Sequence, residues 1–373
     1  MRPEAVDAMQ PFLALHPGNP SGAHAASRRT KTAIEQARTD LADFLGCDVH
    51  EIVFTGGGSE SDNLAVKGAA WAARAADADL DGVVTSAIEH KAVLGAAERL
   101  GHDGFRVATI AADAAGTIDL DALADALDSR TAVVSVMLVN NETGVRQPLD
   151  EIAALVRDRA PKAVLHTDAV QAPQWLDLAV ATQACDLVSI SGHKFGGPKG
   201  VGALVRRRDV PLVPLIEGGG HERGMRAGTH DVAGIVAFAT AATITARTRA
   251  DDCARIEALR DRFEARLERS TGALVRNGDA TLRVPGLSNL AFHGVESEAL
   301  LVALDMAGVC AASGSACSSG ALDPSHVLLA MGCSVDRAQS SLRCSFGWAS
   351  LDSDVDAADV VASCVEQLRS GAS

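Results

Sequence analysis

The order of strand and helix patterns predicts an α/β fold with a smaller C-terminal α+β domain. Short apolar runs rich in β-branched residues alternate with helix-period segments from about residue 30 to about residue 240. This alternation favours a mostly parallel sheet with helices on both faces. A long helical segment follows, and after it strands and helices no longer alternate regularly. We therefore expect two domains, the first of them built around the sheet.

The elements follow one another in βα order. The run 131–138 is the most apolar and β-branched, so we expect it at the centre of the sheet. The expected strands of the first domain are 51–55, 82–86, 105–110, 131–138, 163–165, 186–190 and 202–206, and its helices are 30–45, 59–75, 91–100, 120–127 and 149–159.

The C-terminal part begins with a long helix over 231–269. We place the domain boundary near residue 248, which gives a large domain over 16–247 and a small domain over 248–373, with residues 1–15 packing on the small one. The expected elements of the small domain are strands at 287–293 and 343–345, a helix at 296–307 and a final helix from residue 354.

Composition narrows the class of protein. The chain has 373 residues, of which 47% are hydrophobic and 22% charged, as in globular enzymes. A net charge of −14 disfavours binding to a nucleic-acid backbone. Apolar runs long enough to span a membrane are missing from the sequence, and residues 1–5 contain no apolar signal core. The expected location is the cytoplasm, without a nucleic-acid or membrane partner.

Two neighbouring strands of the expected sheet end on polar residues. The run 163–165 leads to Asp168, and 186–190 leads to Lys194. Ligands of α/β sheets bind at the carboxyl ends of strands. An acid and a lysine on adjacent strand ends suit pyridoxal phosphate (PLP), because the lysine forms the Schiff base and the carboxylate keeps the pyridine nitrogen protonated. The alternative for any lysine is an ordinary surface position.

A glycine-rich turn supplies a candidate phosphate site. Gly56-Gly57-Gly58-Ser59 follows a strand and opens a helix, so backbone N–H groups and the Ser59 hydroxyl can face an anion. The pattern is neither a Walker loop nor a dinucleotide fingerprint. Taken alone, such a turn is as often a plain helix start.

Three more polar residues follow strands and could contact a PLP ring. His90 follows a short strand and could stack on the ring or carry protons, although a lone histidine is more often structural. Asn141 follows the central strand, where the alternative is a simple turn. An amide after the central strand could bond the phenolic oxygen of the cofactor or the substrate. Gln171 comes three residues after Asp168 and could reach the same oxygen.

Two residues of the C-terminal part are candidates for the chemistry. Cys317 lies in a small, polar stretch over 313–320, which predicts an exposed loop and an accessible thiol nucleophile. The chain has eight cysteines, and the others are expected to be buried small residues for the most part, without zinc-binding spacing. Arg343 could clamp a substrate carboxylate, and a structural salt bridge is the equal alternative.

With these motifs the chain resembles the cysteine desulfurases, a class V branch of the fold-type-I PLP enzymes. The resemblance covers nearly the whole chain and implies a seven-stranded sheet. The extended loop after Cys317 resembles that of the long-loop subgroup, which serves iron–sulfur cluster assembly and tRNA thiolation. The motifs are 19–21 with His24, 54–65, 89–93, 140–142, 168–171, 191–194, 218–224, 313–318 and 341–345.

The resemblance implies a role for each candidate residue. Lys194 would be the Schiff-base lysine and proton carrier, His90 would stack on the ring and assist proton transfer, and Asp168 would pair with the pyridinium. Arg343 would bind the substrate carboxylate, and Cys317 would take the sulfur as a persulfide. Gln171 and Asn141 would bond the ring oxygen or the substrate, and Gly58, Ser59, Ser191 and His193 would hold the phosphate.

The resemblance also implies partners. Thr229 would reach the phosphate of a neighbouring subunit, so a homodimer is expected. Sulfur from L-cysteine would pass to acceptor proteins such as an iron–sulfur scaffold, with which Cys317 could share a cluster. The expected cofactor is PLP, and a metal site is not expected.

The chain departs from the family pattern at two places. Members open with a strand of the Tyr-Leu-Asp-x-Ala-Ala-Thr-Thr-Pro type, and residues 1–6 correspond to the segment directly after that strand. Ser59 stands where threonine is commoner and keeps the hydroxyl. A selenocysteine lyase, a class V aminotransferase that would not need Cys317, and a non-catalytic scaffold are the alternatives.

Overall fold

The computed structural model describes residues 1–207, 210–272, 274–313 and 323–371, which form two compact units. The first unit comprises Met1–Ile110, Leu120–Leu138 and Pro148–Arg249, and the second comprises Ala111–Asp119, Val139–Gln147 and Ala250–Ser373. Their division falls inside the long helix α9 (Val232–Thr271). Residues 1–15 group with the first unit, and not with the smaller one, because the backbone N–H of Arg2 donates to Gly196 O at 2.8 Å.

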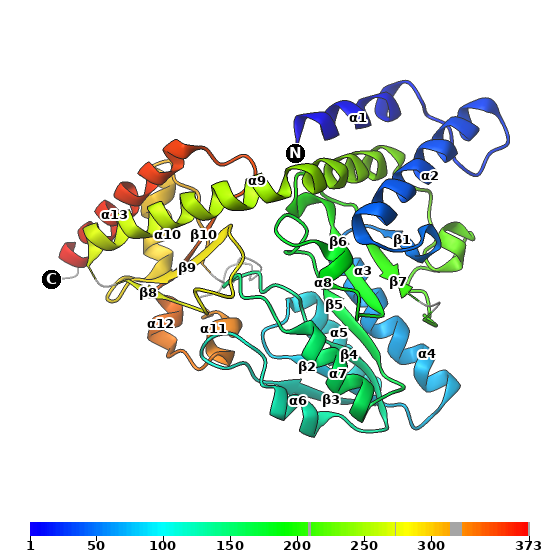
Figure 1. The fold of residues 1–373 in the computed structure, drawn as a ribbon, viewed down its shortest axis with the longest axis horizontal. Coiled ribbons are helices and arrows are strands. Elements are labelled where there is room, and N and C mark those ends of the chain that lie inside the picture. The colour runs from blue at the N-terminus through cyan, green and yellow to red at the C-terminus, as the bar shows by residue number, and fades with distance from the viewer. Residues whose placement is uncertain (208–209, 273, 314–322, 372–373) are drawn as a thin grey trace. The chain divides into compact units, whose positions relative to one another are not determined.

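A seven-stranded sheet forms the centre of the first unit (Figure 1). Its strand order is β1-β7-β6-β5-β4-β2-β3, and the strands are parallel except for β7, which runs antiparallel to β6 and β1. The predicted mostly parallel sheet is thus confirmed. The strands are β1 (Ile52–Thr55), β2 (Gly82–Ser86), β3 (Arg106–Ile110), β4 (Thr131–Ser135), β5 (Val164–Asp168), β6 (Leu187–Ser191) and β7 (Gly202–Arg206).

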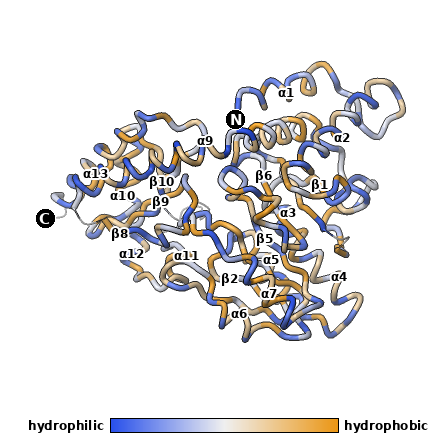
Figure 2. Tube along the Cα trace, in the orientation of Figure 1, coloured by the Kyte–Doolittle hydropathy of each residue, from blue (hydrophilic) through white to orange (hydrophobic). Residues whose placement is uncertain are grey.

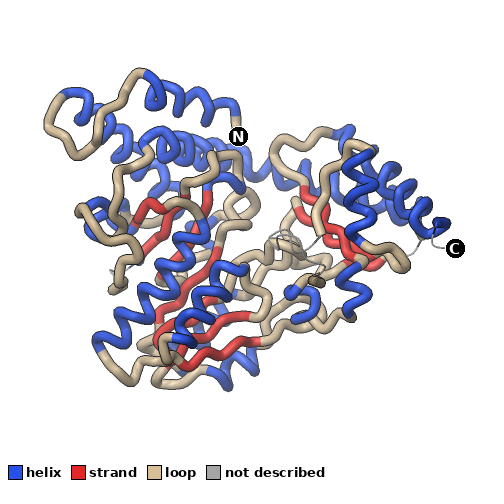
Figure 3. The backbone as a smooth tube through the Cα atoms, turned by 180° about the vertical axis from the view of Figure 1, so that it is seen from behind, coloured by secondary structure: helices blue, strands red, loops and turns tan. Residues whose placement is uncertain are grey.

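Helices cover both faces of this sheet, as Figures 1 and 3 show from opposite sides. Helix α2 begins five residues before its predicted start, because His24 accepts a hydrogen bond from the backbone N–H of Ser27 and caps it. The helices are α1 (Pro3–Ala14), α2 (Ala25–Leu45), α3 (Gly58–Asn63), which continues through the π-helical turn η2 (Leu64–Gly68) into α4 (Ala69–Ala76), α5 (Lys91–His102), α6 (Leu120–Ala126), α7 (Leu149–Arg159) and α8 (Leu178–Ala181).

One buried apolar cluster joins the sheet to the helices on one face. Val83, Val133 and Leu187 on the strands pack with Leu64 of η2 and Val93 of α5, all nearly without solvent exposure. Figure 2 shows the recurrence of hydrophobic residues along these strands. Because burial of such side chains stabilises the fold by about 1.5–3 kcal/mol each, the sheet is a rigid support for whatever its strand ends carry.

The second unit has its own sheet and core. Phe263, Phe292, Leu300, Leu342 and Val361 form the centre of a buried cluster between this sheet and its helices. Its antiparallel strands lie in the order β10-β9-β8, namely β10 (Ser341–Ser345), β9 (Leu287–Ala291) and β8 (Val275–Arg276), and its helices besides α9 are α10 (Ser297–Met306), α11 (His326–Ala330), α12 (Val335–Gln339) and α13 (Ala357–Gly371).

Among the described residues, no helix has the length and apolar character needed to cross a bilayer.

Candidate active site

The carboxyl ends of β5 and β6 bring the predicted acid and lysine into one region of the first unit. The strands are parallel neighbours, with Asp168 as the last residue of β5 and Ser191 as the last residue of β6. A 3₁₀ turn, Gly192–Lys194, follows β6 directly. Desolvation raises the pKa of the buried Asp168 carboxyl, and the hydrogen bond from the Val170 backbone N–H, followed by the interactions with His90 and Lys194, opposes this rise. The acid therefore lies within electrostatic reach of both predicted partners.

His90 is oriented by the helix that it caps. Its Nδ1 accepts a hydrogen bond from the backbone N–H of Ala92 at 3.1 Å, at the start of α5. In a neutral imidazole with an accepting Nδ1, the proton resides on Nε2. His90 thus presents a donor nitrogen, and a ring atom of His90 lies within 4.8 Å of carboxylate oxygens of both Asp62 and Asp168.

A second buried acid, Asp62, stands beside Asp168. Asp62 projects from α3 and is 1% exposed, and its Oδ1 has no hydrogen-bond partner among the described residues. Desolvation, followed by the negative charge of Asp168, raises the pKa of Asp62 well above its usual range. Two adjacent buried carboxylates disfavour each other's ionised form. The pKa of Asp168 is raised by burial as well, but there the hydrogen bond from the Val170 backbone N–H and the charges of His90 and Lys194 oppose the rise.

A neutral histidine lies behind this pair. Burial lowers the pKa of His166 to about 3, and its ring nitrogens bond the hydroxyls of Ser135 at 2.8 Å and Ser189 at 2.9 Å. The 3.7 Å approach of His166 Nε2 to Asp62 Oδ1 is therefore not an ion pair. Glu89 is likewise held neutral at pH 7, since burial raises its pKa to about 8. Among these acids, Asp168 is the one for which the charge of Lys194 opposes the effect of burial on the pKa.

The glycine turn forms a cradle at the start of α3. Gly57 has φ +132°, a conformation that favours glycine, and a Cβ on Gly202 of β7 would come within 2.8 Å of Gly57 Cα. A Cβ on Gly58 would lie 3.6 Å from Ser191 Cβ. The turn and the end of β6 therefore lie side by side, with backbone N–H groups at a helix start.

The remaining predicted phosphate residues lie around this cradle. Ser191 Oγ and His193 Nδ1 are 2.9 Å apart, and desolvation, then the charges of Lys194 and Lys199, lowers the pKa of His193. Ser59 is exposed in the first turn of α3, and Gln171 is half-buried in the turn after β5. The structure brings Gly58, Ser191 and His193 together.

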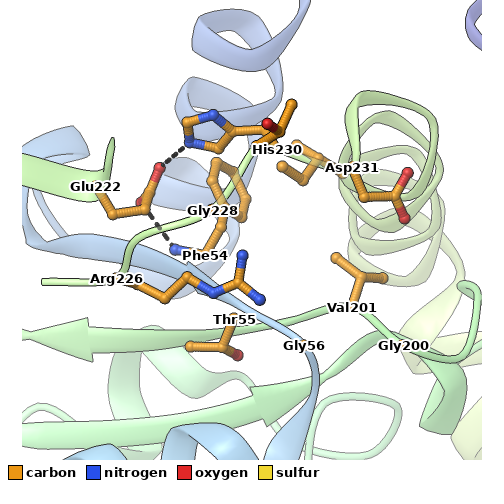
Figure 4. Close-up of a pocket in the computed structure, with 12 residues that line it drawn as sticks. Phe54, Thr55, Gly56, Gly200, Val201, Glu222, Arg226, Gly228, His230 and Asp231 are labelled. Atoms are coloured by element: carbon orange, nitrogen blue, oxygen red, sulfur yellow. Dashed lines mark hydrogen bonds and ion pairs between the residues drawn. The ribbon is translucent and has the colours of Figure 1, made fainter. Parts of the chain in front are cut away.

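A cavity of about 120 Å³ next to the cradle contains Thr229 and Gly56 among its lining residues (Figure 4). Arg226 reaches over this region, and its Nε donates to Glu60 Oε1 at 3.0 Å. Glu60 Oε2 in turn accepts the backbone N–H of Gly56 at 2.8 Å. Glu60 therefore fixes the glycine turn and the Arg226 loop to one another.

Glu222 is the second support of this region; it lies in the 218–224 motif, but no role could be assigned to it from the sequence. Its carboxylate accepts two hydrogen bonds from Arg38, at 2.8 and 3.0 Å, one from the Phe54 backbone N–H at 2.9 Å, and bonds His230 Nε2 at 2.6 Å. Figure 4 shows the contacts with Phe54 and His230. Glu222 has φ +46°, in the left-handed region. Four bonds on one buried carboxylate balance this strain.

The two predicted substrate residues meet in the second unit. Arg343 of β10 donates from Nη1 to the backbone oxygen of Asn141 at 3.1 Å. The Oδ1 of Asn141 is buried without a hydrogen-bond partner among the described residues, so it is an open acceptor for a ligand. Cys317 lies outside the described residues.

These observations fit PLP. A buried acid near a lysine matches the ring nitrogen and the aldehyde carbon, and the glycine cradle at the start of α3 matches the phosphate. The Val170 backbone N–H and the charge of Lys194 favour the ionised form of Asp168, which is the form that pairs with the ring nitrogen. The donor set is therefore that of a PLP site rather than of a bare anion site.

Comparisons with known proteins identify the family of the chain. The aminotransferase class-V family matches residues 1–358. An IscS-like cysteine desulfurase of Mycobacterium tuberculosis is 42% identical over 377 residues, covering all of this chain and 95% of that protein. A solved NifS-like protein has a TM-score of 0.90 at 31% identity, covering 98% of this chain and 95% of its own. A structure described as SspA in complex with cysteine has a TM-score of 0.80 at 33% identity, covering 92% and 95%.

These relatives support the desulfurase branch over a selenocysteine lyase, an aminotransferase or a non-catalytic scaffold. The chain therefore belongs to the aminotransferase class-V family of PLP-dependent enzymes and, within it, to the cysteine desulfurases.

Proposed function

We propose that the protein converts L-cysteine to L-alanine, retains the sulfur as a persulfide on Cys317 and passes it to acceptor proteins. The observation that carries this proposal is the buried Asp168 within electrostatic reach of Lys194, at the ends of two adjacent parallel strands. When bound, PLP supplies an electrophilic carbon for the substrate amine and a ring that takes up the electron pair left at Cα. Side chains of the protein carry out every other part of the reaction.

Binding and proton transfer are divided between the described residues. The Arg343 guanidinium binds the substrate carboxylate. The Asn141 side chain accepts a hydrogen bond from the substrate at Oδ1 or donates one to the ring oxygen from Nδ2. The Lys194 amine removes the Cα proton and returns it. The Asp168 carboxylate would hold the ring nitrogen of PLP in its protonated form, and His90 would offer its Nε2–H for proton transfer.

Sulfur transfer is a nucleophilic step. The Cys317 thiolate attacks the sulfur of the substrate, so an S–S bond forms while the C–S bond breaks and its electron pair goes to carbon. The carbon takes up a proton and leaves as alanine. Cysteine and a thiol thus give alanine and a persulfide without an external oxidant or reductant.

Assembly and location are part of the proposal. We propose a homodimer, since the Thr229 side chain is exposed and available to a second chain. The acceptors would include an iron–sulfur scaffold, as in the long-loop subgroup, with Cys317 able to share a cluster. The seven cysteines in the described part of the chain are free thiols, which suits the reducing cytoplasm.

Alanine and sulfide release from L-cysteine, in the presence of a reducing thiol, tests the reaction. Lys194→Ala should lose both products and the visible absorption of the bound cofactor, whereas Cys317→Ser should keep the absorption and lose sulfide. Wild-type turnover by Cys317→Ser would contradict the proposed nucleophile.

Complementation tests the dimer. In a mixture of Thr229→Ala and Lys194→Ala chains, one of the two sites of a mixed dimer combines an intact Lys194 with an intact Thr229. Activity above the sum of the separate variants is expected. A monomer in sedimentation, or no gain on mixing, would exclude a shared site.

A further inference from the structure

The described residues on either side of 314–322 are tied to neighbouring points of the second unit. On the upstream side, Ala312 pairs with Arg343 as an antiparallel bridge. The backbone N–H of Arg343 donates to Ala312 O at 2.6 Å, and that of Ala312 donates to Arg343 O at 3.2 Å. This bridge lies five residues before Cys317, on the strand that carries the proposed substrate arginine.

The downstream side is held by a buried side-chain contact. Ser325 caps α11 by accepting the backbone N–H of Leu328 at 3.2 Å, and its hydroxyl donates to Glu142 Oε2. Glu142 is 2% exposed and Ser325 is 4% exposed. A hydroxyl-to-carboxylate hydrogen bond shielded from water is stronger than a neutral one, and it lies eight residues after Cys317.

The two ties converge on one turn. Asn141 O accepts the Arg343 guanidinium at 3.1 Å, and the next residue is Glu142. The turn itself is rigid, because Asn140 Oδ1 accepts the backbone N–H groups of Glu142 and Thr143, both at 2.9 Å. The Asn289 side chain also donates to Glu142 O at 3.2 Å. The carboxylate that holds Ser325 is thus part of the turn that contacts the substrate arginine.

We propose that Glu142 and Ser325 are positioning residues for sulfur transfer, which fix the downstream end of the Cys317 segment to the turn that contacts Arg343. The inference rests on the proposed role of Cys317. Eight residues can span up to about 27 Å when extended, so an unfixed end would let the thiol sample a large volume. Fixing both ends beside the substrate-binding arginine raises the effective concentration of the thiol at the substrate sulfur.

A simple helix-capping role for Ser325 is the competing explanation, and the chain offers a matched control. Ser334 caps α12 by accepting the backbone N–H of Arg337 at 3.2 Å, the same geometry as at Ser325. Within the described part of the chain, the Ser334 hydroxyl has no carboxylate partner such as the one that Glu142 provides for Ser325. Ser325→Ala and Ser334→Ala therefore each remove one cap, and only the first removes the hydrogen bond to Glu142.

The experiment uses the PLP-loaded protein and L-cysteine. Cysteine binding is followed by the change in cofactor absorption, and persulfide on Cys317 is followed by mass spectrometry in a single turnover. Ser325→Ala should slow persulfide formation by about 10- to 100-fold with an unchanged Kd for cysteine. Ser325→Thr, which restores a hydroxyl, should recover most of the rate, and Glu142→Gln, which keeps the shape without the charge, should fall between.

Equal rates of persulfide formation in Ser325→Ala and Ser334→Ala would overturn the inference. Wild-type rates in both single variants, Glu142→Gln and Ser325→Ala, would overturn it as well. Should Ser325→Ala fail to fold, the isosteric Glu142→Gln decides by the same readout. Absence of persulfide on Cys317 in the wild-type protein would instead refute the proposed function.

Discussion

Replacement of Glu222 by glutamine should destabilise the first unit by about 3 kcal/mol. Burial alone would raise the pKa of Glu222, but hydrogen bonds from His230 and Arg38 lower it from 4.5 to about 2. At 1.36 kcal/mol per pH unit, this difference corresponds to about 3 kcal/mol of stabilisation of the folded state at neutral pH. This value agrees with the cost of about 3–5 kcal/mol for removing one partner of a buried ion pair, since the remaining acid near Arg38, Glu35 at 3.7 Å, is mostly exposed.

The sign of the pH dependence follows from the lowered pKa. The stabilisation by Glu222 is complete above pH 4.5 and is lost as the pH falls from 4.5 to about 2, where the folded protein takes up the proton. The wild-type protein should lose this contribution over that range. Glu222→Gln has no carboxyl group to protonate at this position, so it cannot lose this contribution. The difference in the free energy of unfolding between the two proteins should therefore become smaller as the pH falls.

Denaturant unfolding at pH 7 and at about pH 3, inside the range from 4.5 to about 2, measures both effects, with Glu268→Gln as the control. Glu268 pairs with Arg276 at 3.0 Å, but its side chain is 48% exposed, so its loss should cost less than about 1 kcal/mol. If Glu222→Gln lowered the free energy of unfolding no more than Glu268→Gln does, the reasoning from burial and charge would be refuted.

Three further substitutions probe the site. Asp168→Asn should lower kcat by about 100-fold at an unchanged fold, because it removes the charge opposite the ring nitrogen; steady-state alanine formation measures this, and an unchanged kcat would contradict it. Asp62→Asn should raise the free energy of unfolding at pH 7, measured by denaturant unfolding. The raised pKa of Asp62 means that the aspartate lowers the stability of the folded protein as the pH rises above 3.8, and asparagine removes this effect. A lower free energy of unfolding for the variant at pH 7 would contradict the raised pKa. Gly57→Ala should weaken PLP binding about tenfold or more, because φ +132° costs a side chain about 1–3 kcal/mol; spectral titration measures the Kd, and wild-type affinity would argue against the cradle.

The sheet and the polar residues at the ends of its strands could be predicted from the sequence alone. Apolar runs that stop on polar residues identify the ends of β5 and β6, and parallel strands bring such ends to one edge, so Asp168 and Lys194 could be paired in advance. The glycine turn before α3 was predictable for the same reason, since it lies directly between a strand and a helix.

The supporting residues could not be predicted, because their partners are distant in the chain. Glu222 meets Arg38 across 184 residues, and Glu142 meets Ser325 across 183. An acid in a helix is ordinarily exposed, so the burial of Asp62 could be suspected only from its place in the apolar period of α3. The segments Ala111–Asp119 and Val139–Gln147 join the second unit through tertiary packing that no local pattern encodes.

We propose above all that the reaction promoted by Lys194 transfers the sulfur of L-cysteine to Cys317. Mass spectrometry after one turnover of the PLP-loaded protein with one equivalent of L-cysteine tests it most directly. We predict one equivalent of alanine and a mass gain of one sulfur atom on the peptide that contains Cys317, with neither in Lys194→Ala. Alanine formation without that mass gain, or with the sulfur on another cysteine, would contradict the account.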